Sequence, residues 1–231
     1  MLKALLFGLG ASSGLVVGGV LGALWQPPKR LVAVALAFAS GTLITALAFE
    51  LFRESFKSGG LLLSAIGLLA GAAVFVAADT LLERYTSGKG ASGFVILAGI
   101  TLDGIPENVA LGLSLLNGVG SVTLLVAIFA SNLPESLGGA VGMRAKGHSR
   151  HFVALTWVAT AVLLTAAVVV GNTVLSEIGE GTLSVLRAFA GGAVLASVAD
   201  TLMPDAYKEG GPLVAFATAA GFLLSFALSH S

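Results

Sequence analysis

Three acidic residues lie near the middle of long apolar stretches, where acids are uncommon. Asp103 and Glu107 interrupt one such stretch, and Glu135 interrupts the next. If these stretches cross a bilayer, each ionised carboxylate at its centre costs about 2.5–3.5 kcal/mol. Three isolated charges would then cost on the order of 8–10 kcal/mol. Acids in such positions must be protonated, hydrated or bound to cations.

Helical spacing groups these acids with other oxygen-bearing side chains. Asp103 and Glu107 are four residues apart and therefore share one face of a helix. Ser131 precedes Glu135 by the same interval, and Asn132 precedes it by three residues. Two facing helices would thus offer carboxylates, an amide oxygen and a hydroxyl to one space. That set of ligands suits a hard or borderline divalent cation.

A proline lies beside the acids in each stretch and adds further acceptors. Proline lacks an N–H, so it leaves the carbonyl four residues earlier without its usual helical partner. Pro106 frees the carbonyl of Leu102 in this way, and Pro134 frees that of Ala130. Two other roles stay open for such residues. Asn and Ser often hydrogen-bond between membrane helices, and buried carboxylates also form proton relays.

The composition places these residues in a membrane protein. The chain has 231 residues, of which 56% are hydrophobic and 10% charged, and its mean hydropathy is +0.99. No soluble single domain hides that much apolar surface, and the same figures exclude a disordered chain or a coiled coil. Twelve Lys and Arg balance twelve Asp and Glu, so no net field attracts a nucleic acid. Without Cys, no disulfide or thiolate metal site can form.

Apolar stretches of the length that spans a bilayer, about 20 residues, divide almost the whole chain. We predict an all-α, polytopic membrane protein whose residues 1–231 form one transmembrane domain in contact with the lipid bilayer. Its eight expected spans are roughly 4–25, 31–52, 61–82, 93–116, 121–143, 152–175, 184–204 and 213–230.

The positive charges predict an orientation for these spans. Eight of the twelve Lys and Arg residues lie in the connections that follow odd-numbered spans, and cytoplasmic connections carry such an excess. We therefore expect both termini outside a multi-pass protein of the cell membrane, either a plasma membrane or a bacterial inner membrane. The eight residues are Lys29, Arg30, Arg84, Lys89, Arg144, Lys146, Arg150 and Lys208.

An internal repeat relates two spans of opposite direction. Residues 37–41 resemble residues 188–192, and at the same offset Glu54 matches Asp205 and Lys57 matches Lys208. This pattern predicts an inverted repeat of spans one to three and six to eight around the central spans four and five. Secondary transporters commonly have such repeats, with the substrate site at the repeat interface.

The polar motifs resemble those of the ZIP (Zrt-, Irt-like protein) family of divalent metal transporters. That family carries a His-Asn-x-Pro-Glu-Gly-like motif in its fourth span and a polar-x-x-Pro-Glu motif in its fifth. The corresponding segments here are residues 103–108 and 131–136, and residues 200–205 resemble the family's seventh span. The resemblance covers nearly the whole chain. It implies no enzymatic activity but transport of a divalent metal, such as zinc, manganese, iron, cobalt or cadmium, toward the cytoplasm by alternating access.

The resemblance also implies a set of metal-ligating positions and a path between spans two, four, five and seven. Asp103 takes the place of the family His, Gly104 that of the family Asn, and Asn108, in the place of the Gly after Glu, restores the lost amide. An all-oxygen site suits Mg, Ca and Mn, whereas imidazole favours zinc. The ligand positions are Asp103, Glu107, Asn108, Ser131, Asn132 and Glu135, and Glu50, Asp79 and Asp200 are candidates for the pathway.

Two other functions remain compatible with these residues. One is a transport-silent membrane scaffold or sensor that keeps the fold after losing the family His. The other is a proton- or sodium-linked carrier of another solute. Only the two carrier hypotheses require acids at mid-membrane. Glycine-rich helix faces allow a homodimer without requiring one.

Overall fold

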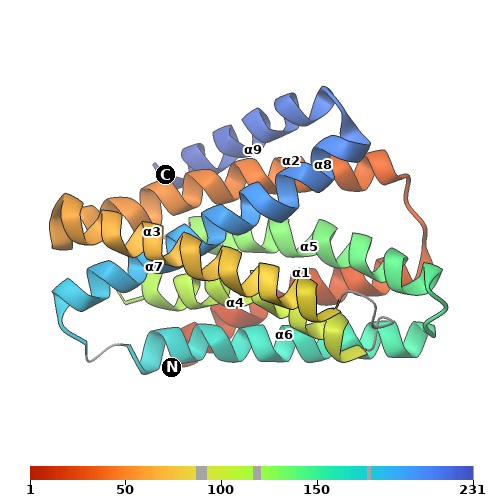
Figure 1. Ribbon diagram of the computed structural model, residues 1–231, viewed down its shortest axis with the longest axis horizontal. Helices are drawn as coiled ribbons and strands as arrows, with labels where there is room; N and C mark the ends of the chain where they lie inside the picture. The colour runs from red at the N-terminus through yellow and green to blue at the C-terminus, as the bar shows by residue number, and fades with distance from the viewer. Residues whose placement is uncertain (87–92, 117–120, 176–177, 231) are drawn as a thin grey trace.

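The computed structural model describes residues 1–86, 93–116, 121–175 and 178–230, in which every regular element is a helix (Figure 1). This confirms the predicted all-α class. Lys89, one of the charges that predict the orientation, lies outside the described residues. The elements are α1 (Leu2–Leu24), α2 (Lys29–Ala46), the π-helix η1 (Leu47–Phe52), α3 (Arg53–Thr86), α4 (Gly93–Ser114), α5 (Ser121–Ala145), α6 (Arg150–Thr173), α7 (Glu180–Ser197), the π-helix η2 (Val198–Leu202), α8 (Met203–Gly210) and α9 (Leu213–Ser229).

Each expected span lies, to within about two residues at its ends, within one helix or a run of consecutive helical elements, such as α2 and η1 for 31–52. Five helical stretches among the described residues are long and apolar enough to cross a membrane, and Leu213–Ser229 is a shorter apolar helix. The longest stretch, Lys29–Tyr85, is broken at Gly60, whose φ of 70° lies in a region that L side chains rarely adopt. The count of eight spans stays a prediction.

One connection differs from the expectation. Residues 53–59 were expected to link two spans, but they continue the helix from η1 and the chain turns only at Gly60. These residues include good helix formers. Within them, Lys57 pairs with Glu54 at 2.6 Å, one helical turn away. A polar segment between apolar spans can thus be helical when its own residues favour a helix.

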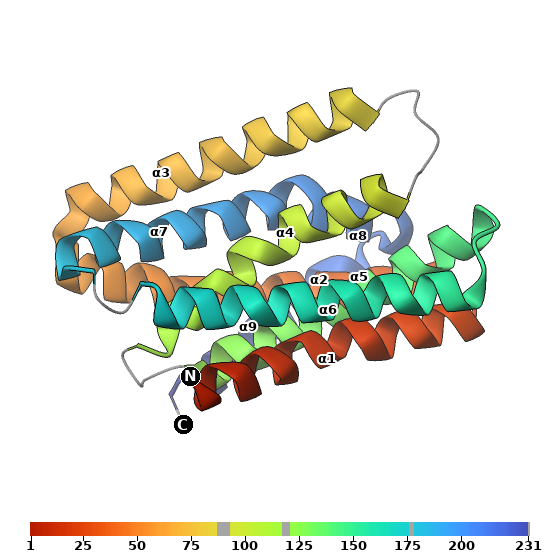
Figure 2. The same cartoon turned by 90° about the horizontal axis from the view of Figure 1, so that it is seen from below.

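The helices form two groups that meet along one interface. In the first, here called the α1/α4/α5/α6 bundle, α1 packs against α5 and α6, and α4 packs against α6. In the second, the α2/α3/α7/α9 bundle, α3 runs along α7 and α2 runs along α9. Figure 2 shows α3 beside α7 on one side of the molecule and α1 beside α6 on the other. The groups meet where α2 contacts α5 and α4 contacts α7.

Glycines bring the helices of the first bundle close together. Gly14, Gly18 and Gly22 follow one face of α1, and a Cβ at any of them would collide with backbone carbonyl oxygens of α5. Such close contacts between backbones are typical of membrane helices, which associate through small residues. The position of α5, and therefore of its acid, depends on this glycine-lined contact.

Two irregular features recur at the same sequence spacing. The π-helical segment η1 follows α2 and η2 follows α7, and each is followed in turn by a glycine with positive φ, Gly60 at 70° and Gly211 at 60°. The interval from η1 to η2 equals the interval from Gly60 to Gly211, and it is also the offset that relates residues 37–41 to 188–192. π-Helical turns often lie at functional sites.

Both ends of the described chain lie at the same end of the molecule (Figures 1 and 2). The α2–α3 turn and the α6–α7 connection lie at this end as well. The opposite end carries the α1–α2, α5–α6 and α8–α9 connections. We call these the terminal end and the opposite end.

Candidate metal site

Glu107 is the most deeply buried acid among the described residues. Only 1% of its surface is exposed, and neither Oε1 nor Oε2 has a hydrogen-bond partner. Glu135 and Asp103 are the two charged groups whose fields act on it. A buried carboxylate without partners is costly, so this position favours a proton or a bound cation.

Glu135 comes from α5, the helix beside α4 that also carries an internal proline. Its Oε1 accepts a hydrogen bond from Ser131, which lies one turn earlier on α5 and is fully buried. The predicted pairing of these two residues is therefore present. The hydroxyl of Ser131 orients the carboxylate and leaves Oε2 for other partners.

Asp103 lies on α4 one turn before Glu107, and its partner comes from the other bundle. Its Oδ1 accepts a hydrogen bond of 2.8 Å from Oγ of Ser197, the last residue of α7. Ser197 in turn lies 3.4 Å, measured between the hydroxyl oxygens, from Thr201 of η2. Asp103 is thus the acid through which the two bundles are joined.

Asp103 and Glu135 line a cavity of about 270 Å³. The other residues of its wall belong to both bundles and lie toward the opposite end of the molecule. They come from Leu36, Pro134, Gly138, Gly139, Trp157, Thr201, Leu202 and Asp205. Glu107 does not line this cavity and lies deeper, one turn farther along α4 toward the terminal end.

On the terminal side of the acids, a group of apolar side chains packs between the two bundles. Leu47, Leu111, Leu124, Ile128 and Val194 come from four different helical elements of both bundles, and each is at most 5% exposed. They belong to the largest hydrophobic core in the described part of the chain. These five side chains lie on the terminal side of Glu107 and the cavity lies toward the opposite end, although Leu202 belongs to both the core and the cavity wall.

Both predicted asparagines are held by backbone carbonyls. Nδ2 of Asn108 donates to the carbonyl of Gly104 at 2.9 Å, while its buried Oδ1 has no partner. Nδ2 of Asn132 donates to the carbonyl of Ala11 on α1 at 2.9 Å. Asn132 thus joins α1 to α5 through its Nδ2, and the unpartnered Oδ1 of Asn108 is an acceptor available to a ligand.

The three pathway candidates lie in two different places. Glu50 is buried in η1, where the charges of Arg53 and Glu54 act on it. Asp79 of α3 and Asp200 of η2 lie near each other, so that the charge of Asp200 acts on Asp79, and the charges of both act on Asp103. Among the residues that the structure describes, no three His, Asp or Glu side chains are gathered closely enough to hold one metal ion together.

Sequence reasoning missed Ser197, Thr201 and Trp157. Ser197 and Thr201 are small polar residues one turn apart on the span that ends in Asp200, and this spacing was the available signal. Trp157 packs where Gly19 and Gly139 leave room for its ring, and its buried Nε1 has no hydrogen-bond partner. An apolar helix with a single Trp gives no indication that the ring borders a polar cavity.

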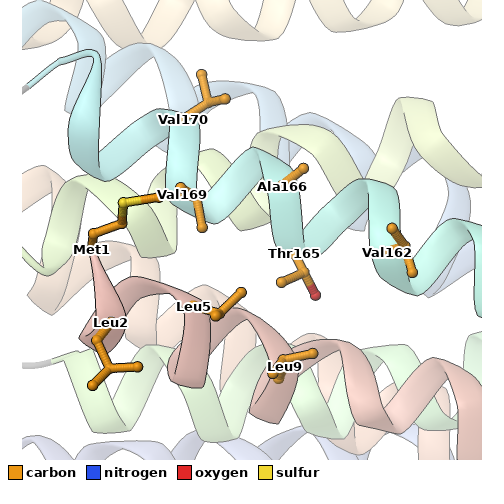
Figure 3. Close-up of a pocket in the computed structure, with 9 residues that line it drawn as sticks. All are labelled: Met1, Leu2, Leu5, Leu9, Val162, Thr165, Ala166, Val169 and Val170. Atoms are coloured by element: carbon orange, nitrogen blue, oxygen red, sulfur yellow. The ribbon is translucent and has the colours of Figure 1, made fainter.

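A larger cavity, of about 710 Å³, lies between α1 and α6 and away from the acids. Figure 3 shows the side chains that face one another across it. Thr165 is the one polar residue in its wall, so it lacks the ligands for a metal ion. The wall consists of Met1, Leu2, Leu5, Leu9, Val162, Thr165, Ala166, Val169 and Val170.

The fold defines the class of the protein, a multi-pass helical membrane protein with carboxylates buried where two helix bundles meet. The chain is similar to an Arabidopsis thaliana protein named "Putative zinc transporter", with 29% identity over 185 residues that cover 75% of this chain and 30% of that protein. It thus spans less than a third of the length of this relative. No family model matches the chain. The similarity supports the ZIP-like family to which the motifs point.

Proposed function

We propose that this protein transports divalent metal ions across the membrane with Asp103, Glu107 and Glu135 as metal ligands, which in the arrangement described lie too far apart to hold one ion together. The observation that carries the proposal is the environment of Glu107, a fully buried carboxylate whose two oxygens lack partners and whose charged neighbours are two further acids. A divalent cation there neutralises the charges and provides the partners that the oxygens lack. Ser131 and the free Oδ1 of Asn108 supply further oxygen ligands.

The surroundings of the acids support transport by alternating access. A cavity reaches Asp103 and Glu135 from the direction of the opposite end, whereas a group of apolar side chains packs between the bundles on the terminal side. A metal ion at this site would have a hydrated path in one direction only. Sliding of one bundle along the other would move the acids from one side of the apolar core to the other. Asp79 and Asp200 would then lie along the path, with Glu50 on the terminal side.

The proposed topology has eight spans, with spans one to three and six to eight as an inverted repeat. The shared spacing of η1 with η2 and of Gly60 with Gly211 supports the repeat, because two unrelated halves have no reason to break their helices at matching positions. Both chain ends lie at one end of the molecule, as an even number of spans requires. With the opposite end in the cytoplasm of a plasma or bacterial inner membrane, the excess of Lys and Arg lies inside and the cavity faces inward, so metal moves toward the cytoplasm.

The substrate is a first-row divalent metal or cadmium, and the relative named as a zinc transporter makes zinc the first ion to test. The oxygen-only ligand set extends the candidates to manganese, iron and cobalt. The transport-silent scaffold gains no support, because a scaffold has no need of three buried acids. A proton-linked carrier needs them too, and flux measurements separate it from a metal transporter. A homodimer remains a proposal that the glycine-rich helix faces permit.

The test is metal uptake by proteoliposomes that contain the purified full chain. A panel of Zn, Mn, Fe, Co, Cd, Mg and Ca should show saturable flux of at least one ion, and Glu107→Gln should abolish it. Glu209→Gln is the matched control, because Glu209 forms only an exposed ion pair with Lys29 and its loss should leave flux unchanged. Equal flux in Glu107→Gln and wild type would refute the proposed site.

A further inference from the structure

One hydrogen bond links an acid of the proposed site to the other bundle. Oγ of Ser197 on α7 donates to Oδ1 of Asp103 on α4 at 2.8 Å. Ser197 is fully buried, at the junction of α7 with η2. It is a buried hydroxyl that bonds to a carboxylate across the bundle interface.

This use of a helical serine is not the usual one. Serine and threonine hydroxyls inside helices commonly donate to a carbonyl three or four residues earlier in their own helix. Ser40 on α2 does so, donating to the carbonyl of Leu36 at 2.9 Å, and Thr201 donates to the carbonyl of Ser197 at 2.5 Å. Ser197 gives its single proton to Asp103 instead, so its hydroxyl is directed at the site.

The bond determines how Asp103 can bind a cation. An ionised carboxylate has two acceptor oxygens, whereas a hydroxyl has one proton to donate. Ser197 therefore holds one oxygen and fixes the plane of the carboxylate, leaving Oδ2 for a metal ion. Carboxylate ligands are commonly oriented by such hydrogen bonds, and loss of the orienting group typically lowers metal affinity about 10- to 100-fold.

We propose that Ser197 is a positioning residue that orients Asp103 toward the metal ion, so that the site is complete only when α7 is in register with α4. This inference rests on the proposed function. A relative displacement of the bundles by more than about 1 Å stretches the 2.8 Å contact beyond hydrogen-bonding distance. Metal affinity then differs between the arrangement in which Ser197 reaches Asp103 and the arrangement in which the bundles are displaced. By thermodynamic reciprocity, bound metal favours the arrangement in which Ser197 reaches Asp103.

The experiment measures metal-induced thermal stabilisation of the purified full chain in detergent, titrated with Zn²⁺ and with Mn²⁺. Ser197→Ala should weaken binding about 10- to 100-fold, whereas Ser197→Thr, which keeps the hydroxyl, should bind like wild type. The matched control is Ser40→Ala, since Ser40 is equally buried in the same bundle but bonds only to its own helix. That control should not change metal affinity.

A second comparison removes the effect of shape. Thr and Val have the same size, so the difference between Ser197→Thr and Ser197→Val reports the hydroxyl alone, even if Ser197→Ala folds poorly. In an Asp103→Ala background, replacing Ser197 should cause no further loss of affinity, because the group that it orients is gone.

The possible results separate the positioning role of Ser197 from the proposed metal site. If Glu107→Gln abolishes binding while Ser197→Ala binds as Ser40→Ala does, Ser197 is only a packing residue and the proposed site stands. Equal losses from Ser197→Ala with and without Asp103 also overturn the positioning role. If the wild type binds none of the metals, the proposed function and the positioning role are both wrong.

Discussion

Replacement of Glu107 by Gln should raise the stability of the metal-free protein and remove its response to metal. Both oxygens of Glu107 lack partners and 1% of the residue is exposed. Keeping a charge there costs up to about 3 kcal/mol, and keeping a proton there instead also costs free energy at neutral pH. Gln has the same shape and no charge to neutralise, so we expect a gain of about 1–3 kcal/mol in the free energy of unfolding without metal.

Metal should reverse the order of the two proteins. A ligand at 100 times its Kd stabilises the native state by about 2.7 kcal/mol, and only the wild type retains the carboxylate that binds it. Melting curves at increasing Zn²⁺ should therefore cross, with Glu107→Gln more stable at zero metal and the wild type at least equal to it at saturation. The exposed control Glu209→Gln should follow the wild-type curve within about 1 kcal/mol. A metal-free Glu107→Gln protein that melts below the wild type would show that the carboxylate has partners and that the reasoning about its burial is wrong.

Three further predictions test the orientation, the metal preference and the helix packing. The chain has no Cys, so a single introduced Cys is the only thiol to label. Ser149→Cys should react with an impermeant thiol reagent only from the cytoplasmic side, and Ser58→Cys only from outside. The reverse pattern would invert the proposed transport direction. Asp103→His should raise the Zn-to-Mn uptake ratio. It should also make uptake fall more steeply below about pH 6.5, where an unperturbed His is protonated. An unchanged ratio and pH profile in an active mutant would mean that Asp103 is not a ligand. Gly18→Ala should destabilise the protein by about 1–3 kcal/mol, since its Cβ would collide with the Leu133 carbonyl. In the control Gly142→Ala, the new Cβ meets nothing within 4 Å, so this variant should be more stable by up to about 1 kcal/mol. Similar melting temperatures for the two variants would contradict the close α1–α5 packing.

The sequence predicted well those features that depend on one helix at a time. Apolar runs located the helices, and the four-residue spacing placed Ser131 and Glu135 on one helix face, where a hydrogen bond joins them. The helical continuation through residues 53–59 was missed because hydropathy locates the end of an apolar run and not the end of a helix. Local propensity and the Glu54–Lys57 pair extend the helix beyond that point.

Features that depend on the packing of one helix against another could not be predicted in this way. Asn132 has the residue type and spacing of a ligand, and in addition its Nδ2 donates to the carbonyl of Ala11 on α1. That contact exists only because Gly14 and its neighbours let α1 approach α5 closely. Similarly, nothing in the spacing of Ser197 shows that α4 will lie opposite it.

The carboxylate at position 103 and the hydroxyl at position 197 are best understood together. An imidazole at position 103 would have two ring nitrogens, one of which binds metal only when the other donates its proton to an acceptor. A carboxylate needs the opposite partner, a donor that fixes its orientation and satisfies one of its oxygens. Ser197 is such a donor, and it stands on the bundle that, in the proposed mechanism, moves relative to Asp103. The replacement of His by Asp therefore changes more than the preference for a metal, because the orientation of this ligand now depends on the register of the two bundles.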